Sequence, residues 1–133
     1  MKKRILITGA SGFIGKHIIE KLSSKYQLIT PSHNELELTN QNAVETYFQN
    51  TSIDTVLHCA NVGGTRKTTH DSRVLDTNLR MFFNLVHCRK YFKIMIFLGS
   101  GAEYDKRNNL RSVKESDFNK SIPIDDYGFS KYI

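Results

Sequence analysis

Three glycines spaced three residues apart lie near the start of the chain, between an apolar run and an amphipathic stretch. They are Gly9, Gly12 and Gly15, and the apolar run at residues 5–7 predicts a strand, whereas helical spacing of apolar residues follows the glycines. Glycine allows a tight turn and a close approach of the backbone to a phosphate, and the first N–H groups of a helix attract anions. This unit predicts an α/β fold with a dinucleotide-phosphate site.

A mononucleotide P-loop is the nearest alternative, because Gly15 is followed by Lys16. That motif requires glycine where Ala10 stands and a magnesium-binding serine or threonine where His17 stands. Both positions differ, so we interpret Lys16 as a solvated helix residue. A purely structural turn is the remaining alternative for the loop.

The overall composition is that of an ordinary soluble globular domain. The 133 residues carry a formal net charge of +6, but the basic residues are scattered, which argues against nucleic-acid binding. No apolar stretch is long enough to span a bilayer, and we expect a cytoplasmic protein. We expect Cys59 and Cys88 to be reduced packing residues, and the histidines show no metal-ligand spacing, so no metal site is predicted.

Strand and helix patterns alternate along the chain. Helices are expected at residues 13–24, 40–49 (capped by Asn40) and 72–91, and strands at 4–8, 25–30, 54–60 and 93–98. This alternation predicts a Rossmann-type, doubly wound parallel sheet, with ligands bound beyond the carboxyl ends of its strands. The nearly continuous apolar run at 93–98 is typical of a strand inside such a sheet. Residues 61–71 are expected to form an exposed loop and residues 99–126 a mostly polar one.

Two helical segments carry further expectations. The 72–91 helix has apolar residues on two faces, which predicts that both are buried and makes the helix a candidate homodimer interface. Residues 127–133 read as a helix start without a cap and with little left to pack against, so we expect this turn to be mobile or docked only by a partner chain. Residues 1–133 are accordingly interpreted as one NAD(P)-binding domain that is truncated before a carboxyl-terminal substrate segment.

Tyr127 and Lys131 are candidates for proton chemistry. They are four residues apart, so on a helix both side chains project from one face. A nearby ammonium favours the ionised form of a phenol, and a tyrosine activated in this way can exchange the proton that hydride transfer at a carbonyl requires. Ser100 directly follows the fourth predicted strand, where its hydroxyl can bond the same substrate oxygen.

Several motifs occur together and in order: the glycine loop at residues 8–15, His58-Cys59-Ala60, Asn78, Leu98-Gly99-Ser100 before Tyr104, and Tyr127-x-x-x-Lys131. In this combination the chain resembles the extended short-chain dehydrogenase/reductase family, in the NAD-dependent epimerase/dehydratase group that modifies nucleotide sugars. The likeness covers essentially the whole chain, but only the amino-terminal part of the family's usual length.

The resemblance implies a set of roles. Tyr127 would handle the proton, Lys131 would hold the nicotinamide ribose and promote ionisation of the tyrosine, and Ser100 would orient the substrate oxygen. The implied cofactor-binding residues are Gly9, Ser11, Gly12, Phe13, Ile14, Gly15, Ser32, His33, Cys59, Ala60, Asn61 and Lys131.

Within this group, residues 34–39 and 62–64 are similar to GDP-fucose synthase and, more distantly, to dTDP-4-dehydrorhamnose reductase. Family dehydratases carry Asp-Glu directly after the position of Ser100, where this chain has Gly101-Ala102, so the acid pair for water elimination is absent. GDP-fucose synthase has a cysteine at the position of Ala102, and alanine cannot exchange a proton. A 4-keto reductase or simple 4-epimerase of nucleotide sugars is therefore favoured. A dinucleotide-binding or sensing module without turnover is the alternative, and the chain alone is expected to turn over little or nothing.

The residues after the second predicted strand bear on the choice between NAD and NADP. NAD enzymes commonly place an acid there, on the adenosine ribose hydroxyls. Here Ser32 and His33 precede the first acid, Glu35, and both could instead accept a 2′-phosphate. The sequence therefore leaves both cofactors open and favours NADP slightly.

Overall fold

The computed structural model describes residues 2–64 and 72–133. Its elements are β1 (Arg4–Thr8), α1 (Phe13–Leu22), β2 (Gln27–Ile29), α2 (Gln41–Asn50), β3 (Thr55–His58), α3 (Ser72–His87), β4 (Ile94–Phe97) and α4 (Asp126–Tyr132). The chain divides into two compact units, which are described separately. The first contains residues 1–61 and 80–98, and the second contains residues 62–79 and 99–133.

The first unit is a parallel four-stranded sheet with the order β2-β1-β3-β4. Its register sets Leu6 of β1 opposite Ile29 of β2 and Val56 of β3, and Val56 opposite Met95 of β4. The chain runs from β1 to one side and then returns to the other, so the strand order reverses between β1 and β3. In doubly wound sheets ligands bind at such a switch point, beyond the carboxyl ends of the strands. The predicted Rossmann-type α/β fold is confirmed.

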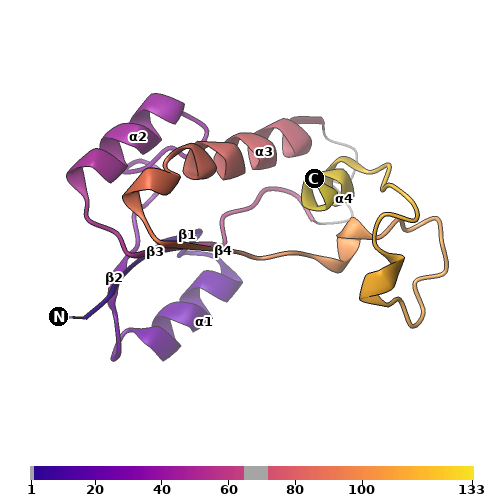
Figure 1. Ribbon diagram of the computed structural model, residues 1–133, viewed down its shortest axis with the longest axis horizontal. Coiled ribbons are helices and arrows are strands. Elements are labelled where there is room, and N and C mark those ends of the chain that lie inside the picture. The colour runs from indigo at the N-terminus through magenta and orange to yellow at the C-terminus, as the bar shows by residue number, and fades with distance from the viewer. Residues whose placement is uncertain (1, 65–71) are drawn as a thin grey trace. The chain divides into compact units, whose positions relative to one another are not determined.

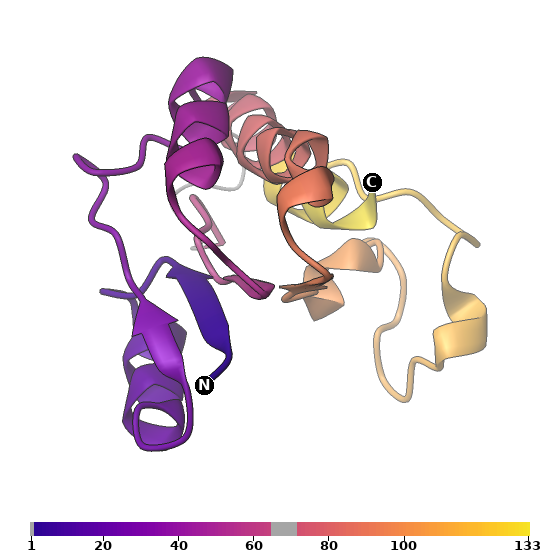
Figure 2. The same cartoon turned by 60° about the vertical axis from the view of Figure 1, so that its left-hand side comes forward.

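Helices cover both faces of this sheet. Side chains alternate between the two faces along each strand, so each face has its own set of packing residues. Ile5, Ile7 and Leu57 pack against the apolar side of α1. Figure 1 shows α1 on this face and α2 with the carboxyl-terminal half of α3 on the opposite one, and Figure 2 shows α2 and α3 again on a shared side. The larger core cluster, on the α2 and α3 side, consists of Leu6, Leu36, Leu38, Val44, Phe48, Ile53, Val56, Met81, Leu85 and Cys88.

The bounds of β1 match the prediction, and those of the other predicted helices and strands differ from it by a few residues. Asn40 caps α2 as predicted, since its side chain accepts a hydrogen bond from Ala43 N at 3.1 Å. The predicted loop at 61–71 falls partly on residues 65–71, which lie outside the described residues. No helix in the described part of the chain has the length and apolar character needed to cross a membrane.

The prediction that β4 lies inside the sheet is wrong for this chain. Strand β4 pairs with β3 and stands at the edge of the described sheet. Ile94 and Ile96, on one face of the strand, remain 51% and 49% exposed. The apolar run is typical of a strand with a neighbour on each side, whereas within the described residues β4 pairs with β3 alone.

Helix α3 also departs from its prediction. It ends at His87 and is followed by a short 3-10 turn at Arg89–Tyr91 rather than continuing to residue 91. One face is buried through Met81 and Leu85, but Phe83 on the other is 52% exposed. The expectation that both faces are buried is therefore not met within one chain.

The second unit contains the amino-terminal half of α3, two 3-10 turns named η2 (Gly101–Glu103) and η3 (Glu115–Asp117), and α4. The expectation that α4 lacks a cap is wrong, because the Asp125 side chain accepts a hydrogen bond from Gly128 N at 2.9 Å. Gly128 and Ser130 are buried, so α4 also has more to pack against than the sequence suggested.

Candidate functional site

The glycine loop follows β1 directly and turns back against the end of β3. Gly9 has a φ of +67°, a conformation that residues with a side chain rarely adopt. A β-carbon at Gly9 would lie 2.6 Å from Ala60 N and 2.8 Å from the carbonyl carbon of Cys59. Glycine is therefore required at this position both by the turn and by the backbone of the neighbouring strand.

The end of the loop is packed equally closely on the start of α1. A β-carbon at Gly15 would lie 2.3 Å from the Gly9 carbonyl oxygen, so α1 can approach the loop only because Gly15 has no side chain. Gly12 precedes α1, and no side-chain hydrogen bond caps the helix there. The N–H groups of the first turn are left for an anion, which is the arrangement that binds a pyrophosphate. Ser11, Phe13 and Ile14 are exposed beside it.

A buried polar network holds the ends of β1 and β3 together beneath the loop. The Thr8 hydroxyl lies 2.7 Å from His58 Nδ1 and accepts a hydrogen bond from Ala60 N at 3.1 Å. Both side chains are almost fully buried, and Phe97 stacks on the His58 ring with 5.4 Å between centroids. Both residues belong to motifs noted in the sequence and directly precede predicted cofactor-binding positions, but nothing in the sequence indicated that they meet.

The remaining predicted cofactor residues of β3 have mixed environments. Ala60 and Cys59 are partly buried and Asn61 is exposed. Burial raises the pKa of the Cys59 thiol, and burial is also the main cause of the raised pKa of Cys88. Both cysteines are free thiols in the structure, as expected.

Ser32 and His33, the predicted 2′-phosphate residues, are each engaged by a nearby acid. Glu35 Oε2 accepts hydrogen bonds from Ser32 N at 2.8 Å and from the Ser32 hydroxyl at 2.7 Å, and these two bonds lower the pKa of Glu35. His33 Nε2 lies 2.7 Å from Glu37 Oε2. A phosphate at this turn would have to displace the Glu35 carboxylate from Ser32.

In the second unit, Tyr127 and Lys131 lie one turn apart on α4, as their spacing predicted. Lys131 Nζ lies 5.9 Å from the centroid of the Tyr127 ring. Burial lowers the pKa of the Lys131 ammonium. The ring of Tyr127 also lies against Gly64, where a β-carbon would come within 3.3 Å of the tyrosine hydroxyl. Gly64 lies in the 62–64 segment, to which the sequence assigned no role.

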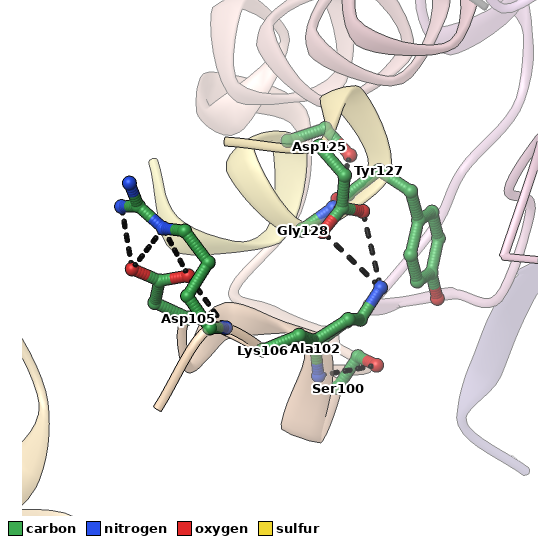
Figure 3. Close-up of polar contacts among 9 residues, drawn as sticks. Ser100, Ala102, Asp105, Lys106, Asp125, Tyr127 and Gly128 are labelled. Carbon is green, nitrogen blue, oxygen red and sulfur yellow. Dashed lines mark hydrogen bonds and ion pairs between the residues drawn. The ribbon is translucent and has the colours of Figure 1, made fainter. Parts of the chain in front are cut away.

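Ser100 precedes the η2 turn, which packs directly on α4. The Ser100 hydroxyl accepts a hydrogen bond from Ala102 N at 3.2 Å and so caps this turn. A β-carbon at Gly128 would lie 2.6 Å from the Ala102 carbonyl oxygen, so the backbones of α4 and η2 are in close contact. Figure 3 shows Ser100 and Ala102 in this turn, together with Tyr127 and Gly128 of the helix. The structure thus brings together the elements that carry the three predicted catalytic residues.

Asn78 of α3 connects several backbone segments around Tyr127. Its amide donates to Val62 O at 3.0 Å and to the Ser130 hydroxyl at 3.2 Å, while its oxygen accepts from Val62 N at 2.9 Å. The Ser130 hydroxyl in turn donates to Tyr127 O at 2.7 Å. Asn78 was among the motif residues, but nothing in the sequence indicated these partners.

The candidate residues therefore form two sets, one in each unit: the glycine loop in the first, and Ser100, Tyr127 and Lys131 in the second. Within the described residues, no group of three or more histidine, cysteine, aspartate or glutamate side chains could hold a metal ion.

Comparisons with known proteins agree with this arrangement. The family described as "NAD dependent epimerase/dehydratase family" matches residues 5–133. GDP-L-colitose synthase of Yersinia pseudotuberculosis is 35% identical over 77% of this chain and 35% of its own length. GDP-L-fucose synthase 1 of Arabidopsis thaliana is 32% identical over 77% of the chain and 34% of its own length. A solved dTDP-4-dehydrorhamnose reductase from Yersinia enterocolitica superposes with a TM-score of 0.84 at 26% identity, over 99% of this chain and 46% of that one. The chain thus spans less than half the length of each of these proteins.

Proposed function

Because the chain belongs to the NAD dependent epimerase/dehydratase family, we propose that it forms the cofactor-binding part of an NAD(P)-dependent oxidoreductase of nucleotide sugars, of the 4-keto reductase or epimerase type. The observation that carries this proposal is the second unit, where Tyr127 and Lys131 lie one turn apart on α4 and the helix packs on the turn that follows Ser100. Its relatives include a GDP-L-colitose synthase and a GDP-L-fucose synthase. We further propose that residues 1–133 belong to one NAD(P)-binding domain.

The glycine loop fits the cofactor that the family name implies. The backbone contacts at Gly9 and Gly15 leave no room for side chains, and the first turn of α1 has N–H groups without a side-chain cap. The loop and this turn would hold the pyrophosphate, beside Ser11, Phe13 and Ile14. When bound, the nicotinamide supplies or accepts a hydride.

Residues of α4 and η2 would manage the proton. The Tyr127 hydroxyl would give a proton to, or take one from, the sugar oxygen at the reacting carbon, and the Ser100 hydroxyl would hydrogen-bond that oxygen. Lys131, half-buried beside the tyrosine ring, would provide positive charge that stabilises the phenolate and would bind the nicotinamide ribose. The absence of acidic side chains at Gly101 and Ala102 argues against water elimination at the same site.

The central test replaces Tyr127 with phenylalanine in protein that retains any sequence following Ile133. We expect reduction of nucleotide 4-keto sugars, followed by NADPH absorbance, to fall about 100- to 10,000-fold because a general acid is lost. Binding of NADPH, measured by calorimetry, should remain within about twofold. Tyr132→Phe is the matched control, since Tyr132 lies on the same helix and its hydroxyl donates to Asn119.

Two results would contradict the proposal. One is a Tyr127→Phe variant that retains wild-type turnover. The other is tight cofactor binding by the wild type without turnover of any sugar in a panel of GDP- and dTDP-linked substrates, which would favour the dinucleotide-sensing alternative.

For the cofactor we propose a modest preference for NADP, supported by Ser32 and His33 after β2. Glu35 now occupies both hydrogen-bond donors of Ser32 and adds negative charge where a 2′-phosphate would bind. Glu35→Gln should therefore improve NADP affinity about two- to fivefold, the range of exposed charge interactions, and leave NAD affinity unchanged. Calorimetry with both cofactors measures this, and an equal change for NAD and NADP would remove Ser32 from the 2′-phosphate site.

We also propose that the exposed side of α3 forms a homodimer interface. Phe83 is exposed on this helix, and Phe82 beside it packs edge-on against Phe83 with 5.4 Å between ring centroids. Phe83→Asp should shift the protein toward monomer in light scattering. Phe118→Asp, at another exposed phenylalanine, should not. An unchanged mass for Phe83→Asp would exclude this interface.

A further inference from the structure

Three consecutive residues after η2 contact the segment that leads into α4. Asp105, Lys106 and Arg107 together reach Ser121, Ile122 and Asp125. The residues between these two groups, 108–120, form an excursion that contains η3 and whose side chains are mostly exposed. Polar contacts therefore hold the two ends of the excursion together, whatever the length and composition of the residues between them.

Asp105 is the centre of this base. Its carboxylate is 2% exposed and accepts hydrogen bonds from Arg107 Nε at 2.9 Å and Arg107 Nη2 at 2.6 Å. It also accepts a hydrogen bond from the Ser121 hydroxyl. The Arg107 and Ser121 hydrogen bonds hold the pKa of Asp105 well below its usual range. A buried carboxylate with this set of donors is ionised and fixed in one orientation.

The two neighbouring cations continue the contact toward the helix. Arg107 Nη2 donates to Ile122 O at 3.2 Å, and Lys106 Nζ lies 3.2 Å from the Asp125 carboxylate. Asp125 is the residue that caps α4, through Gly128 N. Figure 3 shows the Lys106 side chain extending to Asp125 beside Tyr127, with Asp105 on the other side of Lys106.

The entry into α4 bears directly on where Tyr127 lies, because the helix begins at Asp126 and Tyr127 is in its first turn. Its entry angle is set by the preceding residues 121–125, which belong to no regular element. The contacts at residues 105–107 tie that entry to the end of η2.

We propose that Asp105, Lys106 and Arg107 are positioning residues, which hold the 121–125 segment and thereby keep Tyr127 and Lys131 of α4 in place against the turn that carries Ser100. The proposal rests on the catalytic role given to these three residues above. The positioning itself is a property of the second unit and can be measured without turnover.

The test uses Arg107→Met and Ser121→Ala, with Arg111→Met and Ser121→Thr as controls. Arg111 is an exposed arginine of the same excursion whose backbone N–H donates to Asn109, and threonine keeps the hydroxyl that Asp105 binds. Amide exchange at residues 126–132 should become at least about tenfold faster in the two test variants, because Ser121→Ala removes one hydrogen bond to a charged group and Arg107→Met removes several. Exchange in β1 should not change, and both controls should match the wild type.

Turnover gives a second readout in protein that retains any sequence following Ile133. The test variants should lose about tenfold in kcat while the Kd for NADPH changes less than twofold, and Ser121→Thr should keep the wild-type kcat. Unchanged exchange in α4 for both variants would overturn the proposal, as would an equal acceleration in β1, because the role would then be general stability. A wild type that neither binds NADPH nor turns over would instead refute the proposed function, and the exchange experiment would still decide the positioning role.

Discussion

The glycine loop and helix α4 are both close to candidate chemistry, but they are held in place in different ways. The loop is fixed by backbone packing: Gly9 touches the end of β3 and Gly15 touches the loop itself, above a sheet whose strands are hydrogen-bonded along their length. Helix α4 has a close backbone contact at Gly128 and a hydrogen bond from Asn78 to Ser130, and its entry is held by side-chain contacts of Asp105 and Asp125 that include ion pairs.

The difference teaches which perturbations each region should feel. Backbone packing is indifferent to salt and pH but tolerates no added atom. Contacts between ionised side chains accept changes of shape but respond to protonation and to loss of charge. The following predictions test this division.

The largest effect should come from adding one methyl group to the loop. A β-carbon at Gly15 would lie 2.3 Å from the Gly9 carbonyl oxygen, so Gly15→Ala forces the loop or α1 to shift, at a cost of about 1 to 3 kcal/mol. We expect a loss of NADPH affinity in calorimetry and lower stability in urea. Gly101→Ala is the matched control, because no atom beyond its own residue and its two chain neighbours lies within 4 Å of the added carbon. Equal behaviour of the two variants would show that the loop is not fixed by packing.

A smaller effect is expected beneath the loop. Thr8→Val keeps the shape of the side chain but leaves Ala60 N and His58 Nδ1 without the hydroxyl, which should cost about 1 to 2 kcal/mol of unfolding free energy in urea denaturation. Thr8→Ser retains the hydroxyl and should recover most of this stability. If Thr8→Val is as stable as the wild type while Thr8→Ser is destabilised, the methyl group rather than the hydrogen bonds matters, and polar contacts would contribute little in the first unit.

The third prediction concerns the response to acid. Its effect should be the smallest of the three and confined to the second unit. The pKa of Asp105 is lowered in the folded protein, so its contribution to stability is complete above the unfolded pKa of about 3.9 and is lost as the pH falls below it. Amide signals of α4 in NMR spectra should therefore weaken between about pH 4 and pH 2 before those of β1.

Two variants make this prediction specific. Asp105→Asn should remove the acid transition of α4, because this substitution already loosens α4 at neutral pH. Asp117→Asn should leave the transition intact, although the pKa of Asp117 is also lowered, chiefly by its hydrogen bond from Lys120. Simultaneous loss of α4 and β1 signals would mean that the two regions do not differ in their response to acid.

Local patterns in the sequence predicted the first unit well. The Gly9 to Gly15 spacing, the Asn40 cap and the alternation of strands and helices each depend on residues close together in the chain. The same local reading misjudged β4, because an apolar strand looks alike at the centre and at the edge of a sheet. It also missed the Asp125 cap, since an aspartate before Tyr127 can as easily be a loop residue.

By itself, the sequence determined that a strand, a glycine loop and a helix follow one another, and that Tyr127 and Lys131 share a helical face. These conclusions need only backbone sterics and the period of a helix. Only the tertiary structure decided that Thr8 meets His58, that Asn78 meets Ser130 and that Asp105 meets Ser121. Such pairs join residues 16 to 52 positions apart. No periodicity in the sequence predicts these pairs, because the packing of whole elements determines which residues meet.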